Sequence, residues 1–98
     1  MLREMLANNP GDSFLQHAMA LELVKAGDDA AAAKVFEALL GANPDYVGSY
    51  YHLGKLYERK GDSMQALEWY EKGMEVARSV GDMHAFGELR AAADNLEG

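Results

Sequence analysis

Short sequence motifs recur along this chain at one fixed spacing, and this repeat limits the possible folds more than any other feature. Asn9-Pro10 returns 34 positions later as Asn43-Pro44, and Gly27-Asp28 returns as Gly61-Asp62. Three further positions keep the same or a similar residue, namely Ala32 and Ala66, Phe36 and Tyr70, Glu37 and Glu71. Each period contains two helical patterns of about a dozen residues with turns between them. The repeat therefore predicts an all-α, right-handed array of helical hairpins, a solenoid that works by presenting a surface.

Length and composition set the remaining bounds. The 98 residues suffice for a single domain, and 49% of them are hydrophobic, which is ordinary for a folded protein. Alanine, leucine, glutamate and methionine are frequent, as helices favour. Cysteine is absent, so a disulfide framework and thiol chemistry are excluded.

The chain is acidic, with 16 Asp and Glu residues against 9 Lys and Arg residues and a net charge of −7. Binding to nucleic acid or to an anionic membrane needs a basic surface, so neither is expected. Residues 1–6 lack the apolar segment of a signal peptide, and no run is long enough to span a bilayer. We expect a soluble, cytoplasmic protein.

The first repeat is expected over residues 13–46. It should hold a helix from about Ser13 to Lys25 and a second from about Ala30 to Leu40. Ser13 and Gln16 have the spacing of a capping box at the first helix start. Gly27 allows the left-handed conformation that ends a helix, and Asp28 or Asp29 would then cap the second. Pro44 stops that helix because proline lacks the amide donor.

The second repeat, residues 47–80, follows the same plan. A helix from about Val47 to Lys60 should end at Gly61. Asp62 and Gln65 have capping-box spacing and would open a helix that runs to about Ser79. Arg78 stands where the period calls for proline, so this helix should be longer than its counterpart.

Partial units are expected at both ends, which gives about five helices in all. Residues 1–8 resemble the last turns of a helix, and residues 82–97 form a capping helix with apolar residues at helical spacing: Met83, Phe86, Leu89, Ala93 and Leu96. The start within a repeat leaves open whether the chain belongs to a longer array. Met1 and the capping helix favour a free-standing protein.

Together, these residues resemble the tetratricopeptide repeat. The segment Tyr50-x-x-Leu53-Gly54-x-x-Tyr57 is followed by Gly61-Asp62, Ala66, Tyr70 and Gly73, which is similar to the family pattern of aromatic, small and turn residues. The first repeat is similar but more degenerate, with Gln16 in place of the aromatic residue and Leu39 in place of a small one. Alanine or glycine is expected where two helices approach closely, at Ala20, Ala32, Gly54 and Ala66.

The resemblance implies a groove, lined by the first helix of each repeat, that binds a peptide. Carried over to this chain, the groove positions in the first repeat are Phe14, His17, Leu21 and Val24. In the second repeat they include Tyr51, His52, Lys55 and Arg59, together with Glu58. Lys55 and Arg59 lie four residues apart on one helix face, so they would hold a carboxylate or a free C-terminus of a partner. The alternative is a solvated face on which these cations pair with Glu58 or another neighbouring acid.

Some members of this family clamp the C-terminal carboxylate of chaperones with lysine and asparagine side chains. His17, Leu21 and His52 stand at the corresponding positions here, so that clamp is broken and chaperone-tail binding is not expected. A metal site at His17 and His52 is not expected either, because no further ligand is suitably spaced. No cofactor is implied.

The helix from Ser13 carries apolar residues on nearly every side, which is typical of a helix that is buried all round. Either residues 1–8 fold over it, or Phe14, Leu21 and Val24 meet an apolar partner such as a second copy of this chain. Trp69 is expected to pack partly exposed between helices, the alternative being a role in stacking on a ligand.

No enzyme signature is present: there is no phosphate-binding glycine loop and no plausible nucleophile triad, and threonine is absent. We therefore expect a non-catalytic module that binds a peptide or a protein partner in its groove. The alternative is self-association, in which the apolar face builds a homodimer or an assembly scaffold. A two-repeat chain has a physical motive for this, because three repeats are normally needed for stability.

Overall fold

The computed structural model describes residues 2–97, and over this range every regular element is an α-helix. The chain divides into two compact units at the Asn43–Pro44 bond. Unit 1 contains α1 (Leu2–Asn8), α2 (Ser13–Lys25) and α3 (Asp29–Ala42), and unit 2 contains α4 (Gly48–Lys60), α5 (Ser63–Val80) and α6 (Met83–Glu97). The all-helical prediction is confirmed. The predicted count of about five was one too low for this range, because residues 2–8 form a helix of their own.

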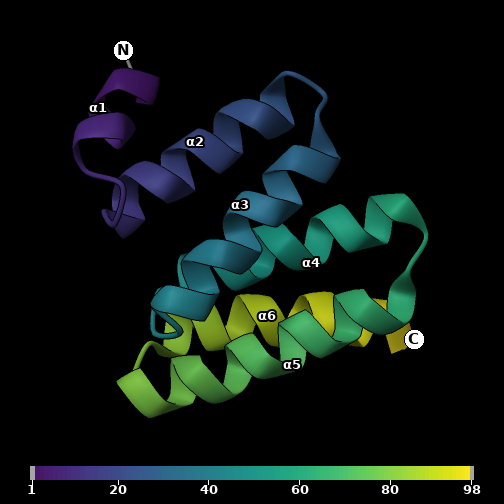
Figure 1. The fold of residues 1–98 in the computed structure, drawn as a ribbon. Coiled ribbons are helices and arrows are strands. Elements are labelled where there is room, and N and C mark those ends of the chain that lie inside the picture. The colour runs from purple at the N-terminus through teal and green to yellow at the C-terminus, as the bar shows by residue number, and fades with distance from the viewer. Residues whose placement is uncertain (1, 98) are drawn as a thin grey trace. The chain divides into compact units, whose positions relative to one another are not determined.

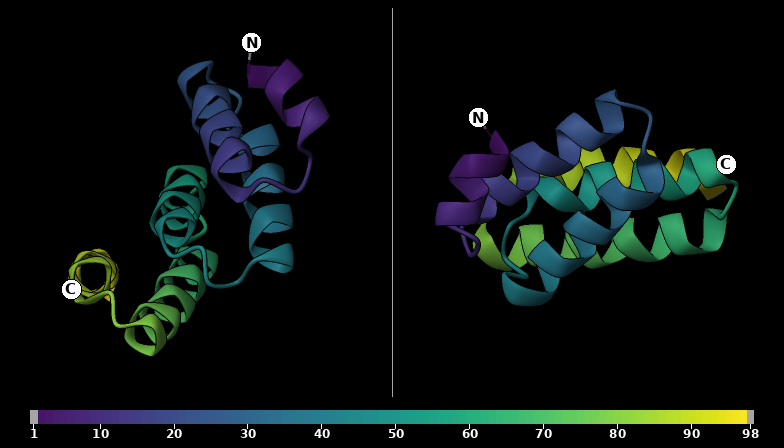
Figure 2. Two further views of the ribbon diagram at one scale, coloured as in Figure 1. Left: turned by 90° about the vertical axis from the view of Figure 1, so that its left-hand side faces the viewer. Right: turned by 45° about the horizontal axis from the view of Figure 1, so that its top comes forward.

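Each unit is built around one helical hairpin. In unit 1, α2 packs on α3 and α1 packs on α2; in unit 2, α5 packs against both α4 and α6, and α4 also contacts α6 (Figure 1). The loop from α5 to α6 is short, and these two helices run side by side in the further views (Figure 2). The helix limits do not define where one repeat ends and the next begins. The repeat boundaries given above, residues 13–46 and 47–80, therefore stay a prediction.

Aspartates start four of the six described helices. The side chains of Asp12, Asp28, Asp62 and Asp82 each accept a hydrogen bond of 3.0–3.1 Å from the backbone N–H three residues later. This satisfies an amide that has no partner within the helix. The capping box predicted at Ser13 was wrong, because Asp12 precedes it and caps the helix instead. Ser13 is the first helical residue, and its Oγ accepts a hydrogen bond of 3.0 Å from Asn43 Nδ2.

The helix ends follow the predicted signals. Gly61 closes α4 at φ 88°, and Gly27 follows α2 at φ 84°, a left-handed conformation that residues with a Cβ rarely adopt. Helix α3 ends one residue before Asn43, as Pro44 requires. Helix α5 has 18 residues against 14 in α3, so the longer helix predicted from Arg78 is confirmed.

Small residues allow the helices of unit 2 to approach closely. A Cβ added to Gly54 of α4 would overlap the ring of Tyr70 in α5. One added to Gly73 of α5 would lie 2.6 Å from the Cβ of Tyr50. Both tyrosines are fully buried, and the Tyr50 hydroxyl donates a hydrogen bond of 2.6 Å to the Pro44 carbonyl ahead of α4. These contacts fix α4 against α5 and so set the direction of the outward face of α4.

The last helix buries a slightly different stripe from the predicted one. Leu89 and Ala93 are buried as expected, and Ala92 is buried with them. Met83 is 60% exposed, so its place in the buried stripe was wrong. Met83 is the first residue of α6 and directly follows the turn at Gly81 and Asp82. Within residues 2–97, no helix has the length and apolar character needed to cross a membrane.

Candidate functional site

The face of α4 carries five of the residues predicted to line a groove, and Tyr51 contacts two of them, His52 and Lys55. The ammonium group of Lys55 lies 5.4 Å from the centre of the Tyr51 ring, one helical turn away, in a cation–π contact. The Tyr51 and His52 rings meet edge to face with centroids 5.8 Å apart. The backbone spacing of α4 places these groups on adjoining surfaces, and all three are half-buried.

Lys55 also has a charged neighbour on its own helix. Its Nζ lies 3.4 Å from Oε2 of Glu58, three residues on. The same carboxylate oxygen accepts a hydrogen bond from the hydroxyl of Tyr70 in α5. Of the two alternatives that the sequence left open for Lys55, pairing with Glu58 is present in the structure. Because both side chains are partly exposed, such a pair contributes at most about 1 kcal/mol to stability.

The hydroxyl of Tyr70 is held neutral by its surroundings. Burial raises the pKa of Tyr70, and the hydrogen bond and negative charge of Glu58 raise this pKa further. The Tyr70 ring also lies 6.3 Å from the Tyr51 ring, centre to centre. Tyr70 was predicted to be a core residue, which its complete burial confirms. Its link to the charged face was missed, because a partner twelve residues away leaves no local signal in the sequence.

His52 lies where α4 and α6 come together. Burial lowers the pKa of His52, while the negative charge of Glu88 on α6 partly opposes that shift. Glu88 also lies 3.8 Å from the exposed imidazole of His84. Arg59, in the last turn of α4, is exposed. Among residues 2–97, no three His, Cys, Asp or Glu side chains gather in a way that would hold a metal ion.

The predicted groove residues of unit 1 form a more apolar group on α2. Phe14 is 67% exposed, whereas His17, Leu21 and Val24 are half-buried. The His17 ring meets the buried Phe36 of α3 edge to face at 5.5 Å. Helix α2 is thus apolar on nearly all sides, and the side that carries Phe14, Leu21 and Val24 is not fully buried within the described residues. Whether the α2 group and the α4 group share one groove stays a prediction.

Helix α1 covers a different side of α2. A hollow between the two helices is lined by Leu2, Arg3, Met19, Glu22, Leu23 and Ala26. Helical geometry places Met19, Leu23 and Ala26 roughly opposite to Phe14 and Leu21. Residues 2–8 therefore fold over α2 without covering its predicted groove face.

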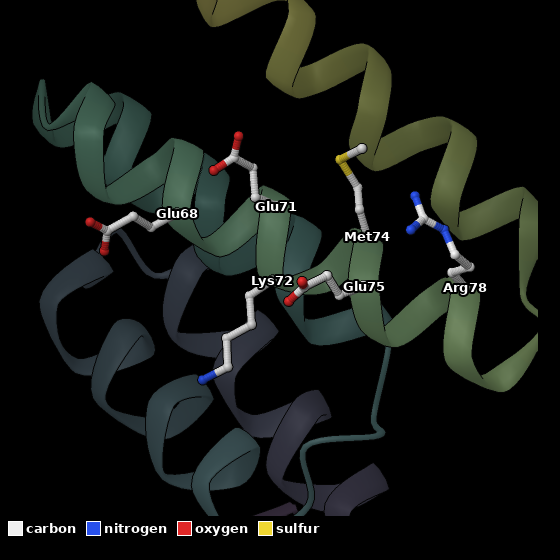
Figure 3. A pocket seen from close by; sticks show the side chains of 6 residues that line it. All are labelled: Glu68, Glu71, Lys72, Met74, Glu75 and Arg78. Atoms are coloured by element: carbon white, nitrogen blue, oxygen red, sulfur yellow. The ribbon is translucent and has the colours of Figure 1, made fainter.

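A second hollow lies on the outer side of α5, lined by Glu68, Glu71, Lys72, Met74, Glu75 and Arg78 (Figure 3). Met74 and Arg78 extend toward α6 in this view, and the Arg78 guanidinium lies 5.1 Å from the centre of the Phe86 ring. Lys72 also contacts Trp69, with 5.4 Å between the ammonium group and the ring centre. Trp69 packs 6.2 Å from Tyr50, and its indole N–H has no acceptor among the described residues. Its partly exposed packing is as predicted.

Helical hairpins, glycine-allowed contacts and an outward face on the first helix of a hairpin define a helical-repeat protein. The model of the tetratricopeptide repeat matches residues 17–74, which is more than half of the sequence. The chain belongs to the tetratricopeptide repeat family. Repeats of this family and fold are generally non-catalytic scaffolds, and membership indicates a protein-interaction module with a protein partner.

Known relatives cover nearly the whole chain. The crystal structure of a tetratricopeptide repeat domain protein from Salinibacter ruber is 44% identical, covers 89% of this chain and 97% of its own, and has a TM-score of 0.85. A solution structure of a Bordetella parapertussis protein is 27% identical, covers 98% of this chain and 84% of its own, and also scores 0.85. A TPR repeat-containing protein of Pseudomonas aeruginosa is 28% identical over 96 residues, which is 98% of this chain and 91% of that protein.

Proposed function

We propose that this protein binds a peptide segment of a protein partner, and that the Tyr51–Lys55–Arg59 face of α4 contacts acidic side chains or a free C-terminus of that segment. The observation that carries the proposal is the cation–π contact of Lys55 on Tyr51, which holds an ammonium group on a half-buried aromatic surface. Arg59 follows one turn later as a second cation. The acidic character of the rest of the chain makes this pair of cations a local exception.

The face has the properties of a small preformed binding surface. The packing of Tyr70 against Gly54 and of Tyr50 against Gly73 leaves α4 little freedom to move against α5. Tyr51 and His52 supply rigid rings beside the charge, and tyrosine and arginine are frequent among residues that dominate binding energy. A partner would then bind without a large rearrangement of unit 2.

The test selects ligands without assuming their sequence. Peptides with free C-termini would be selected on the purified protein from a random display library, and their affinities measured by calorimetry. Replacing Lys55 and Arg59 together with alanine should weaken the binding of selected peptides about thirtyfold, since each of the two charge-assisted contacts contributes on the order of 1 kcal/mol. The double variant Lys34→Ala/Arg90→Ala removes equal charge at exposed positions elsewhere and should have no effect. Equal binding by all three proteins would contradict the proposed face.

Self-association is a second candidate, and one observation favours it. Phe14 is 67% exposed on a helix where Leu21 and Val24 are only half-buried, and α1 leaves this side uncovered. A second copy of the chain would bury these residues in a homodimer. Light scattering over a concentration series tests this: a dimer that Leu21→Glu dissociates would support it, and a monomer throughout would exclude it.

A further inference from the structure

The carboxylate of Glu58 occupies the position next to Lys55 that a partner's carboxylate would use. Its Oε2 lies 3.4 Å from the Lys55 ammonium group, and the fully buried Tyr70 donates its hydroxyl to that same oxygen. The Lys55 ammonium group also lies 5.4 Å from the centre of the Tyr51 ring in a cation–π contact. An aromatic residue of unit 2 therefore contacts each charged group: Tyr51 contacts the Lys55 ammonium group, and Tyr70 contacts the Glu58 carboxylate.

We infer that Glu58 is an internal competitor for Lys55, so that it determines how strongly the α4 face accepts an acidic segment. The inference rests on the proposed function and adds a specificity-determining residue to it. A partner carboxylate that reaches Lys55 must either displace Glu58 or lie beside it. In both cases the approaching negative charge is opposed by a fixed one.

The magnitude of this competition follows from the exposure of the pair. Two like charges about 4–5 Å apart at a partly solvated surface repel each other enough to change an affinity about fivefold. The hydrogen bond from Tyr70 prevents the carboxylate from rotating away, since a bond to a charged acceptor is roughly twice as strong as a neutral one. Without Glu58, weak anionic ligands would bind better, and discrimination among them would be poorer.

The corresponding positions in unit 1 lack this pair. Leu21 and Val24 stand 34 positions before Lys55 and Glu58. Phe36, which corresponds to Tyr70, carries no hydroxyl to hold a carboxylate. The internal competitor is a property of the α4–α5 hairpin and not of the repeat as such.

A first experiment tests the pairing without any ligand. Lysines would be acylated with an excess of N-hydroxysuccinimide acetate, and the modification of each lysine followed by mass spectrometry. The variant Glu58→Gln keeps an oxygen acceptor for Tyr70 and removes the charge. Lys55 should be acylated several times faster in this variant, with Lys25 and Lys34 as internal references. An unchanged rate at Lys55 would overturn the inference.

A second experiment tests the competition with a defined probe, the peptide acetyl-Ala-Leu-Glu-Asp with a free C-terminus, in an NMR titration. Glu58→Gln should bind it about fivefold more tightly than the wild type, mainly through amides of α4. Glu71→Gln is the matched control, because it makes the same charge change on the outer side of α5. A peptide with glutamine, asparagine and a C-terminal amide in place of the acidic groups should show no gain.

The outcomes of these experiments distinguish the competition by Glu58 from the proposed peptide binding on which it rests. If the wild type and Glu58→Gln bind the probe equally, peptide binding stands and the internal competition is overturned. If no variant binds it and the library selection also yields no ligand dependent on Lys55 and Arg59, the proposed function fails and the competition fails with it. Faster acylation together with tighter binding supports both.

Discussion

Helices α2 and α4 stand at equivalent positions of the repeat. Comparing their outward faces distinguishes the contacts that belong to the fold of the hairpin from the residues that could bind a partner. Each places an aromatic ring against an aromatic of the following helix: His17 on Phe36 at 5.5 Å, and Tyr51 on Tyr70 at 6.3 Å. The members of these two pairs are 34 positions apart in the sequence. The ring pair is therefore part of the hairpin itself.

The residues one and two turns further along differ in chemistry. Leu21 and Val24 continue an apolar surface on α2, whereas Lys55 and Glu58 form an ion pair on α4. The hydroxyl that distinguishes Tyr70 from Phe36 is the group that bonds to Glu58. The Tyr70 hydroxyl and the Glu58 carboxylate thus occur together in unit 2, whereas Phe36 and Val24 stand at the corresponding positions of unit 1. The hairpin tolerates apolar or charged residues at the positions of Leu21 and Val24 or of Lys55 and Glu58 because these positions are only half-buried.

A second difference lies in the tightness of the contact between the two helices. Gly54 of α4 has no space for a Cβ beside the Tyr70 ring, whereas Ala20, its counterpart in α2, is fully buried with its Cβ in place. The missing Cβ at Gly54 leaves room for the Tyr70 ring, whose hydroxyl bonds to Glu58 on α4. The two differences are therefore connected.

The largest expected effect on stability comes from substituting Gly54, and the substitution of Ala20 is its comparison. Gly54→Ala should lower the free energy of unfolding by about 1–3 kcal/mol, because the new Cβ overlaps the Tyr70 ring and forces the core to shift. Ala20→Gly should cost only about 1 kcal/mol, the usual penalty of glycine within a helix. Urea denaturation followed by circular dichroism measures both. A smaller loss for Gly54→Ala than for Ala20→Gly would contradict the difference in packing.

The next largest effect should come from the hydroxyl of Tyr70. Tyr70→Phe should cost about 1–2 kcal/mol at pH 7 by removing a hydrogen bond to a carboxylate, while Glu58 itself can still be solvated. The folded-state pKa of Tyr70 is raised above the ordinary 10.0. The contribution of the hydroxyl is therefore complete below pH 10 and is lost as the pH rises through the folded-state pKa. A difference from wild type that grows above pH 10 would refute this role.

The smallest effect concerns His52, whose pKa is lowered by burial from 6.5. The unfolded chain takes up a proton on this group more readily than the folded one, so its contribution is present above pH 6.5 and declines as the pH falls below that value. The free energy of unfolding should thus fall less between pH 7.5 and pH 5.5 in His52→Gln than in the wild type. His84→Gln removes an exposed histidine as the control. Equal pH profiles for all three proteins would show that burial of His52 does not matter.

Much of the fold could be predicted because its signals are local. Helix α2 begins and ends at the predicted residues, and α3, α4, α5 and α6 lie within two residues of the expected limits. Asp28, Asp62, Gly27 and Gly61 act within one helical turn, where the sequence order is also the spatial order. The wrong cap predicted at Ser13 is also a local error, of one residue. Asp12 and Ser13 can both cap a helix, and only the backbone conformation selects Asp12.

The candidate site was predictable only in part. The spacing of Lys55 and Glu58 made their pairing one of two alternatives, and the structure shows that pairing. Tyr51 and His52 were placed on the same face by the repeat, but their positions in a binding groove stay a prediction. The exposure of Phe14 agrees with its predicted place on the groove side of α2, but the sequence could not say what would cover that side.

By itself, the sequence determined that this chain is a helical repeat, where five of its helices begin and end to within two residues, and which residues are small enough for close contact. Those features depend on backbone conformation and on periodicity, which act over a few residues. Only the tertiary structure decided that Tyr70 reaches across the hairpin to Glu58 and that Glu58 holds Lys55. Such contacts depend on how closely two helices pack, a distance set by the whole interface between them.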